Sequence, residues 1–284
     1  YIKLCWYNFI FIIFFDNLFI KDLFMKVIIL AGGKGTRIAE ESQYKPKPMI
    51  MIGNKPIIWH IMKIYAKYNF KEFVITLGYK GQAIKDYFIN YQYINSDLKI
   101  NLHNKEIEIL NDIGEDWIVN LIETGEEVMT GGRIKKAFEF VNHKTIMATY
   151  GDGLADININ KLIEFHKSHG KLATITVVRP TSRFGEVLFD EGSKKVTNFN
   201  EKPLKGKQGW IGGGFMVLEP QVADYIESYD TPFESFPLEN LCKEEELMAY
   251  QHEGFWHPVD VLRDKLLLQG LWDQNKAFWK VWKN

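Results

Sequence analysis

Short apolar runs alternate with amphipathic helical segments along the chain from Met25 onward. Residues 26–30 form an apolar run that leads into glycines, as expected of a strand covered on both faces. Behind a proline, which the first turn of a helix tolerates, isoleucines recur at helical spacing at Ile57, Ile61 and Ile64. This alternation predicts an α/β fold with a Rossmann-like, mostly parallel sheet flanked by helices.

The same two patterns continue toward the C-terminus. Strands are expected over 72–77, 145–150, 171–178 and 212–218, and helices over 81–91, 131–141 and 160–169. Residues 98–123 instead alternate polar and apolar positions, with a turn expected at 111–116, which predicts a small insertion of paired antiparallel strands. No repeat or linker-like stretch interrupts the chain, so we expect residues 25–284 to form a single domain.

The first 24 residues form a separate segment that is strongly apolar and aromatic. It has neither a strongly basic start nor a small-residue cleavage site, so it makes a poor signal peptide. As a membrane span it is marginal, because a span needs about 20 apolar residues and Asp16 would lie well inside it. We therefore expect the native protein to begin at Met25 and residues 1–24 to be an extension outside it.

Charge and cysteine content limit the partners of this protein. The 35 basic residues nearly balance the 36 acidic ones, for a net charge of -1, so no overall attraction to nucleic acid or to an acidic membrane is expected. Any bound anion must be held by a local cluster of cations. Cys5 and Cys242 offer neither a disulfide framework nor metal-ligand spacing, which favours a reducing, cytoplasmic location.

Three glycines, Gly32, Gly33 and Gly35, follow the first predicted strand directly. Exposed backbone N–H groups in such a loop can hold phosphate oxygens. The dinucleotide-binding pattern is excluded because Ile38 stands where that pattern requires its third glycine. The Walker pattern is excluded because it requires Ser or Thr after its lysine, and Lys34 is followed by Gly35. The remaining pattern is Gly-Gly-x-Gly-Thr-Arg followed by Lys-Pro-Lys-Pro, which predicts a triphosphate approached by cations from two sides.

The stretches "LAGGKGTR" and "KPKPM" resemble the sugar-1-phosphate nucleotidyltransferases, and the resemblance covers essentially all of residues 25–284. The stretches "TGGRIKKA", "TYGDGLAD" and "EGFWHPVDVLRDK" are similar to the branch that uses CTP and glucose 1-phosphate. The resemblance implies a nucleotidyltransferase fold, homo-oligomers, and a product, CDP-glucose, that supplies CDP-linked deoxysugars for bacterial surface polysaccharide. Neither a nucleic acid nor a membrane is implied as a partner.

In the implied reaction, an oxygen of glucose 1-phosphate attacks the α-phosphorus of CTP and pyrophosphate leaves. The attacking oxygen is already an anion, so catalysis needs orientation and charge neutralisation rather than a general base. The resemblance assigns catalytic roles to Arg37, Lys47 and Asp152. It also assigns nucleotide contacts to Leu30, Ala31, Gly32, Gly33, Lys34, Gly35, Thr36, Arg37, Lys47, Val128, Gly132, Arg133 and Asp152.

Two anionic substrates require a divalent cation, and Mg²⁺ takes one or two carboxylates together with phosphate oxygens. Asp152 is the best candidate ligand, because it follows a predicted strand at the edge where such sheets bind ligands. By resemblance, its partner is Asp260, although Asp264 lies close by.

The sugar phosphate is assigned by resemblance to Lys202, with Glu201 accepting hydrogen bonds from sugar hydroxyls. Gly185 and Gly213 would let the backbone approach the sugar. Arg133 has three open roles: reading the cytosine edge, contacting phosphate, or starting the helix that follows. The chain departs from the family pattern at Gly212, where relatives have Asn, and at Val128, where they have a hydroxyl residue.

Three other functions share parts of this pattern. A uridylyl- or thymidylyltransferase would carry nearly the same loop. A metal-dependent glycosyltransferase usually has an Asp-x-Asp pair, whereas the chain reads Gly151-Asp152-Gly153. A non-catalytic regulatory relative should have lost the loop cations that this chain retains.

Overall fold

The structure is a computed structural model that describes residues 25–35, 38, 45–111, 114–180, 186–189, 192–200 and 209–283. The expectation for residues 1–24 lies outside these ranges. Among the described residues, no helix is both long and apolar enough to cross a bilayer.

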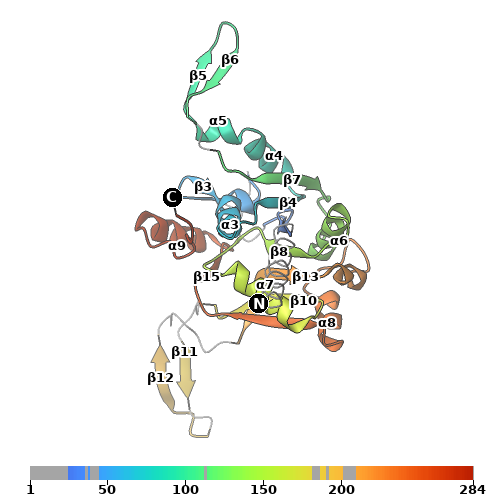
Figure 1. Cartoon of the computed structure of the whole chain (residues 1–284). Coiled ribbons are helices and arrows are strands. Elements are labelled where there is room, and N and C mark those ends of the chain that lie inside the picture. The colour runs from blue at the N-terminus through green and yellow to red at the C-terminus, as the bar shows by residue number, and fades with distance from the viewer. Residues whose placement is uncertain are drawn as a thin grey trace, which may run out of the picture.

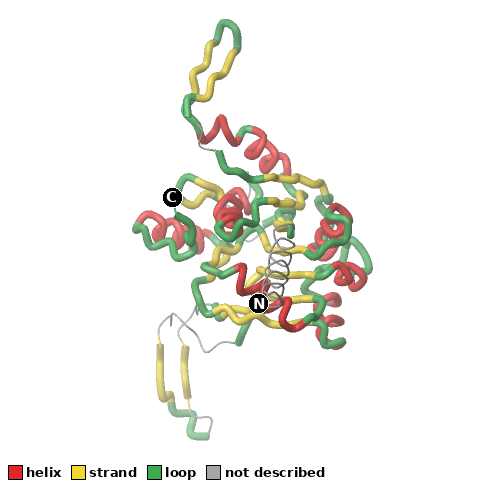
Figure 2. Tube along the Cα trace, in the orientation of Figure 1, coloured by secondary structure: helices red, strands yellow, loops and turns green. Residues whose placement is uncertain are grey.

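Seven strands form the central sheet, in the order β14-β10-β13-β8-β1-β4-β7 (Figures 1 and 2). They are β1 (Lys26–Leu30), β4 (Glu72–Leu77), β7 (Ile118–Glu123), β8 (Ile146–Tyr150), β10 (Ala173–Val178), β13 (Ile211–Leu218) and β14 (Leu247–His252). β13 runs antiparallel to both of its neighbours, and the other four pairings are parallel. The predicted mostly parallel sheet is confirmed.

Helices cover both faces of this sheet (Figure 1). They are α3 (Ile57–Ala66), α4 (Gly81–Ile89), α5 (Tyr91–Asn95), α6 (Thr130–Phe140), α7 (Ile159–His169), α8 (Phe236–Lys243) and α9 (Leu262–Asp273). In β1, Val27 and Ile29 join the core that contains α3 and α7, whereas Ile28 and Leu30 join the core that contains α6 and α8. Alternate side chains therefore enter opposite cores, which explains the continuous apolar run of this strand.

Short elements complete the described fold. They are β2 (Met51–Ile52), β3 (Lys55–Pro56), β9 (Gly153–Ala155), β11 (Glu186–Phe189), β12 (Val196–Asn200), β15 (Trp256–Pro258) and the 3₁₀ helices η2 (Lys47–Met49) and η3 (Pro220–Tyr225). β9 pairs antiparallel with β15. This pairing joins segments that lie about a hundred residues apart in the sequence.

The antiparallel pairing expected over residues 98–123 is correct only for its first part. β5 (Leu98–Asn101) and β6 (Glu106–Ile109) pair antiparallel around a turn at 102–105, and this hairpin projects from the body (Figure 1). β7 instead pairs parallel with β4 at the edge of the central sheet. The mixed exposure of β7 gives the same alternating pattern as a hairpin strand. The pattern therefore did not distinguish pairing with β4 from antiparallel pairing within the insertion.

The aromatic C-terminal segment packs into the core. Trp279 is fully buried, and its ring and those of Trp272 and Trp282 surround the imidazole of His60. His60 Nδ1 accepts a hydrogen bond from Trp279 Nε1 at 3.4 Å, and Nε2 lies 3.0 Å from the carbonyl oxygen of Ile52. These partners fit a neutral imidazole with its proton on Nε2.

His60 is expected to make the protein sensitive to acid. Burial lowers the pKa of His60 from 6.5 to about 4, so the unfolded chain takes up this proton first as the pH falls. The contribution of His60 to the free energy of unfolding is fully present above pH 6.5. It decreases by about 3 kcal/mol as the pH falls toward 4. Urea unfolding across this range should show a steeper loss for the native protein than for His60→Gln. If the free energy of unfolding fell equally with pH in the native protein and in His60→Gln, the prediction would be contradicted.

Candidate active site

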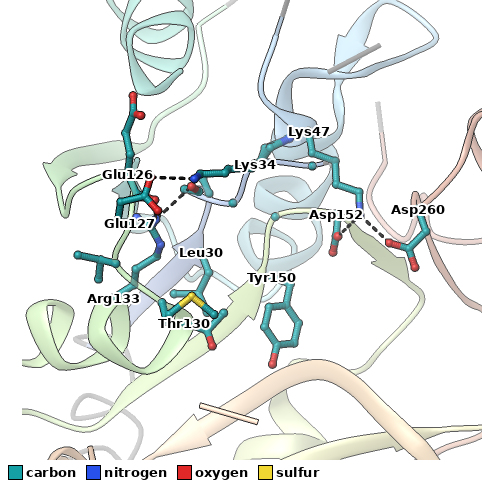
Figure 3. Close-up of a pocket in the computed structure, with 18 residues that line it drawn as sticks. Leu30, Lys34, Lys47, Glu126, Glu127, Thr130, Arg133, Tyr150, Asp152 and Asp260 are labelled. Atoms are coloured by element: carbon teal, nitrogen blue, oxygen red, sulfur yellow. Dashed lines mark hydrogen bonds and ion pairs between the residues drawn. The ribbon is translucent and has the colours of Figure 1, made fainter. Parts of the chain in front are cut away.

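A cavity of about 490 Å³ lies at the carboxyl ends of β1 and β8 (Figure 3). This edge is where open α/β sheets bind ligands. Of the predicted nucleotide-contacting residues, those that line the cavity are Leu30, Ala31, Gly32, Gly33, Lys34, Gly35, Lys47, Val128, Arg133 and Asp152, together with the predicted metal ligand Asp260. The structure therefore brings together residues from three distant parts of the chain.

The glycine loop is held by the neighbouring strand end and by a buried arginine. The carbonyl oxygen of Gly32 accepts hydrogen bonds from the Tyr79 amide at 3.2 Å and from Arg133 Nη2 at 3.1 Å. A β-carbon at Gly32 would lie only 2.0 Å from Arg133 Nη1, whereas one at Gly33 would meet no atom within 4 Å. The first glycine thus permits a close approach of loop and guanidinium.

Arg133 serves as an anchor beneath this loop. Its side chain is buried, and its guanidinium also donates to the carbonyl oxygen of Leu77 at 2.9 Å and to Thr124 Oγ1. Burial lowers the pKa of Arg133. Of its three open roles, the position near the start of α6 is confirmed, and a contact with base or phosphate stays a prediction.

Lys47 bridges the two carboxylates that were predicted to bind metal (Figure 3). Its Nζ lies 2.6 Å from Asp152 Oδ2 and 2.7 Å from Asp260 Oδ1. Burial alone would lower the pKa of Lys47, but the two carboxylates outweigh it and raise the pKa above its ordinary value. Lys47 begins η2 with a proline on each side, and the prolines restrict the backbone around it.

Asp152 and Asp260 meet because their strands pair. Asp152 directly precedes β9, Asp260 follows β15, and these two strands pair; the amide of Val259 also donates to the carbonyl oxygen of Asp152 at 2.9 Å. The nearby Asp264 has a different task, because its Oδ2 accepts from the backbone amides of Asp260 and Val261 at 2.9 and 3.0 Å. Asp264 caps α9, and Asp260 faces the cavity.

The opposite wall of the cavity carries further charge. Lys34 Nζ lies 2.7 Å from Glu127 Oε1, and both side chains are exposed. Glu126, Glu127, Thr130 and Tyr150 also line the cavity. None of these four was predicted from the sequence. For Tyr150, the signal was its place at the end of the strand directly before Gly-Asp-Gly.

The sugar side of the site is only partly within the described residues. Of the predicted sugar-phosphate residues, Gly185, Glu201 and Lys202 lie outside them, and so do the predicted nucleotide contacts Thr36 and Arg37. In contrast, the predicted sugar contact Gly213 in β13 is described. Its carbonyl oxygen accepts a hydrogen bond from Trp256 Nε1 at 2.8 Å. Gly213 does not line the described cavity. The predicted nucleotide contact Gly132 does not line it either, because Gly132 packs against the backbone of Tyr229.

Comparison with known proteins identifies the family. The protein-family model described as "Nucleotidyl transferase" matches residues 26–261 of this chain. A glucose-1-phosphate cytidylyltransferase of Salmonella typhi is 48% identical over 260 residues, which cover 91% of this chain and 100% of the relative. This chain belongs to the nucleotidyltransferase family. A probable glucose-1-phosphate cytidylyltransferase of Bacillus subtilis is 43% identical over 259 residues, with 91% of this chain and 100% of the relative covered.

Solved structures share the fold of this chain. HddC from Yersinia pseudotuberculosis superposes with a TM-score of 0.63 at 25% identity, over 87% of this chain and 99% of that one. UDP-glucose pyrophosphorylase complexed with UDP-glucose also gives 0.63, at 15% identity, over 88% of this chain and 99% of that one. The second likeness concerns the fold alone.

The carboxylate pair of this nucleotidyltransferase suits a divalent cation. Asp152 and Asp260 direct one oxygen each at the same cationic group, the ammonium of Lys47. That ammonium marks a position that already accepts positive charge between two oxygen ligands. Two carboxylates, with the remaining ligands from water and phosphate, are the donor set that hard divalent cations prefer.

Proposed function

We propose that this nucleotidyltransferase transfers a cytidylyl group from CTP to glucose 1-phosphate, giving CDP-glucose and pyrophosphate. The observation that carries the proposal is the 43–48% identity to glucose-1-phosphate cytidylyltransferases along their whole length. The cavity supports it with a glycine loop and lysines on two sides, as a triphosphate requires.

The chemistry follows from charge and position. A phosphate oxygen of glucose 1-phosphate forms a bond to the α-phosphorus of CTP as the bond to the bridging oxygen breaks, and that electron pair leaves with pyrophosphate. The glycine-loop amides orient the triphosphate, and Lys47 neutralises charge that builds on its oxygens. Arg37 and Lys202 are proposed as further cations, for the triphosphate and the sugar phosphate.

Mg²⁺ is the cation that we propose for Asp152 and Asp260. When bound there, it would screen the two substrate phosphates from each other and act as a Lewis acid. The chain's own part is to hold the two carboxylates together through the β9–β15 pairing.

The product tests this function directly. Purified protein incubated with CTP, glucose 1-phosphate and Mg²⁺ should form CDP-glucose, identified by anion exchange and mass spectrometry. Galactose 1-phosphate and mannose 1-phosphate serve as competing sugars in parallel reactions. Formation of a different CDP-sugar would contradict the sugar assignment. Absence of any nucleotide sugar would contradict the function.

We also propose a cytoplasmic homo-oligomer. Cys242 is a free, exposed cysteine, in keeping with a reducing compartment. The β5–β6 hairpin supports self-association, because its strands place Leu98, Ile100, Ile107 and Ile109 on one face. Ile100 and Ile107 are 54% and 48% exposed, and an isolated two-stranded hairpin is marginally stable in water. A second copy of the chain would cover this face.

Substitution on the two faces of the hairpin tests this assembly. Ile107→Lys places an unpaired charge in the proposed contact and should raise the dissociation constant more than about tenfold. Glu106→Lys, which places the same side chain on the opposite face, should leave assembly unchanged. Sedimentation velocity measures both. A native protein that sediments as a monomer would contradict the proposal.

A further inference from the structure

We propose that Lys47 is an internal counter-ion that closes the metal position until the nucleotide arrives, so that divalent cation and nucleoside triphosphate bind as a coupled pair. The inference rests on the proposed function for the identity of these two ligands. It adds an order of events that the carboxylate pair alone does not imply.

The position between the carboxylates is already taken by a positive charge. Lys47 Nζ lies 2.6 Å from Asp152 Oδ2 and 2.7 Å from Asp260 Oδ1, and the lysine side chain is only 13% exposed. Contacts this short are charge-assisted hydrogen bonds. A divalent cation that reaches the same two oxygens must therefore displace the ammonium.

Displacement is costly unless the ammonium finds another anion. The remaining carboxylates among the described cavity residues, Glu126 and Glu127, lie on the opposite wall (Figure 3). Glu127 is already paired with Lys34 there. A triphosphate in the cavity offers that anion, and the flexible four-carbon stem of lysine allows the ammonium to move to it.

This exchange couples the two binding events. Without nucleotide, the cation competes with an ammonium held by two carboxylates. With nucleotide, the ammonium neutralises phosphate and the carboxylates are available to the cation. Linkage makes the effect reciprocal, and such couplings are typically about 5–150-fold in affinity.

Binding of Mn²⁺ alone tests the inference without any catalytic readout. Mn²⁺ is paramagnetic, so its free concentration can be followed by electron paramagnetic resonance. Lys47→Met, which keeps a long side chain and removes the charge, should bind Mn²⁺ at least about tenfold more tightly than the native protein when no nucleotide is present. Lys34→Met removes the same charge from the same cavity but not from between Asp152 and Asp260. It should stay within about twofold of the native affinity.

Two further measurements locate the effect. Adding Asp152→Asn to Lys47→Met should abolish the gain in Mn²⁺ affinity. Mn²⁺ should also raise the unfolding temperature of Lys47→Met more than that of the native protein, because it fills the place that the ammonium left.

Measuring the Mn²⁺ affinity with and without CTP distinguishes failure of this inference from failure of the proposed function. In the native protein CTP should increase the Mn²⁺ affinity, and in Lys47→Met this increase should be smaller. Unchanged or weaker Mn²⁺ binding by Lys47→Met without nucleotide overturns the counter-ion role. If the native protein binds no Mn²⁺ even with CTP, both the inference and the metal assignment fall.

Discussion

Asp152→Asn should lower kcat by at least about 100-fold, the scale seen when one charge-stabilising group is removed from an active site. Asparagine has nearly the same shape but no charge, so the divalent cation loses one of its two carboxylate ligands. The steady-state rate of pyrophosphate release at saturating CTP and glucose 1-phosphate measures this loss.

The fold should survive Asp152→Asn. Lys47 keeps its ion pair with Asp260 at 2.7 Å, and the β9–β15 pairing does not involve the substituted side chain. Asp224→Asn makes the same change at an exposed position of η3 and should retain native activity. Near-native turnover of Asp152→Asn, with an unchanged unfolding temperature, would contradict the role of Asp152 as a metal ligand.

Gly32→Ala should reduce kcat/KM for CTP by about 100-fold, the effect expected when reacting groups are misplaced by about 1 Å. The added β-carbon would lie 2.0 Å from Arg133 Nη1, so either the loop or the guanidinium must move. The guanidinium is not free to move, because carbonyl oxygens and a hydroxyl accept its hydrogen bonds in a buried site. Overpacking of this kind also destabilises the fold by about 1–3 kcal/mol.

Gly33→Ala provides the matched control for the stability effect. It adds the same β-carbon one residue later, where no atom lies within 4 Å. Its free energy of unfolding should stay within about 0.5 kcal/mol of the native value. Urea unfolding of the two variants measures the difference, and equal stability of both would contradict the packing of Arg133 against the loop.

Local patterns in the sequence predict the elements that support the cavity. β1 and α3 have clear strand and helix periodicities, and the glycines and cations behind β1 indicate a phosphate site by residue type and spacing alone. These features depend on neighbours in the chain, so the sequence shows them directly.

Contacts between distant segments were harder to predict. Asp260 could be assigned only by resemblance, because the β9–β15 pairing that brings it to Asp152 leaves no local signal. The sequence places Arg133 near a helix start, but its carbonyl partners lie in other elements. Likewise, an edge strand of mixed exposure such as β7 shows the alternation of a hairpin strand, so the antiparallel pairing predicted for it was wrong.

A competition assay distinguishes transfer of a cytidylyl group at this site from transfer of any other nucleotidyl group. Protein, Mg²⁺ and glucose 1-phosphate are incubated with equal concentrations of CTP, UTP, dTTP, ATP and GTP in one reaction, and the nucleotide sugars formed are separated and quantified. The ratio of products gives the ratio of kcat/KM values for the competing nucleotides. We predict that CDP-glucose is the dominant product. Dominance of UDP-glucose or dTDP-glucose would contradict the base assignment while leaving the family and the chemistry intact.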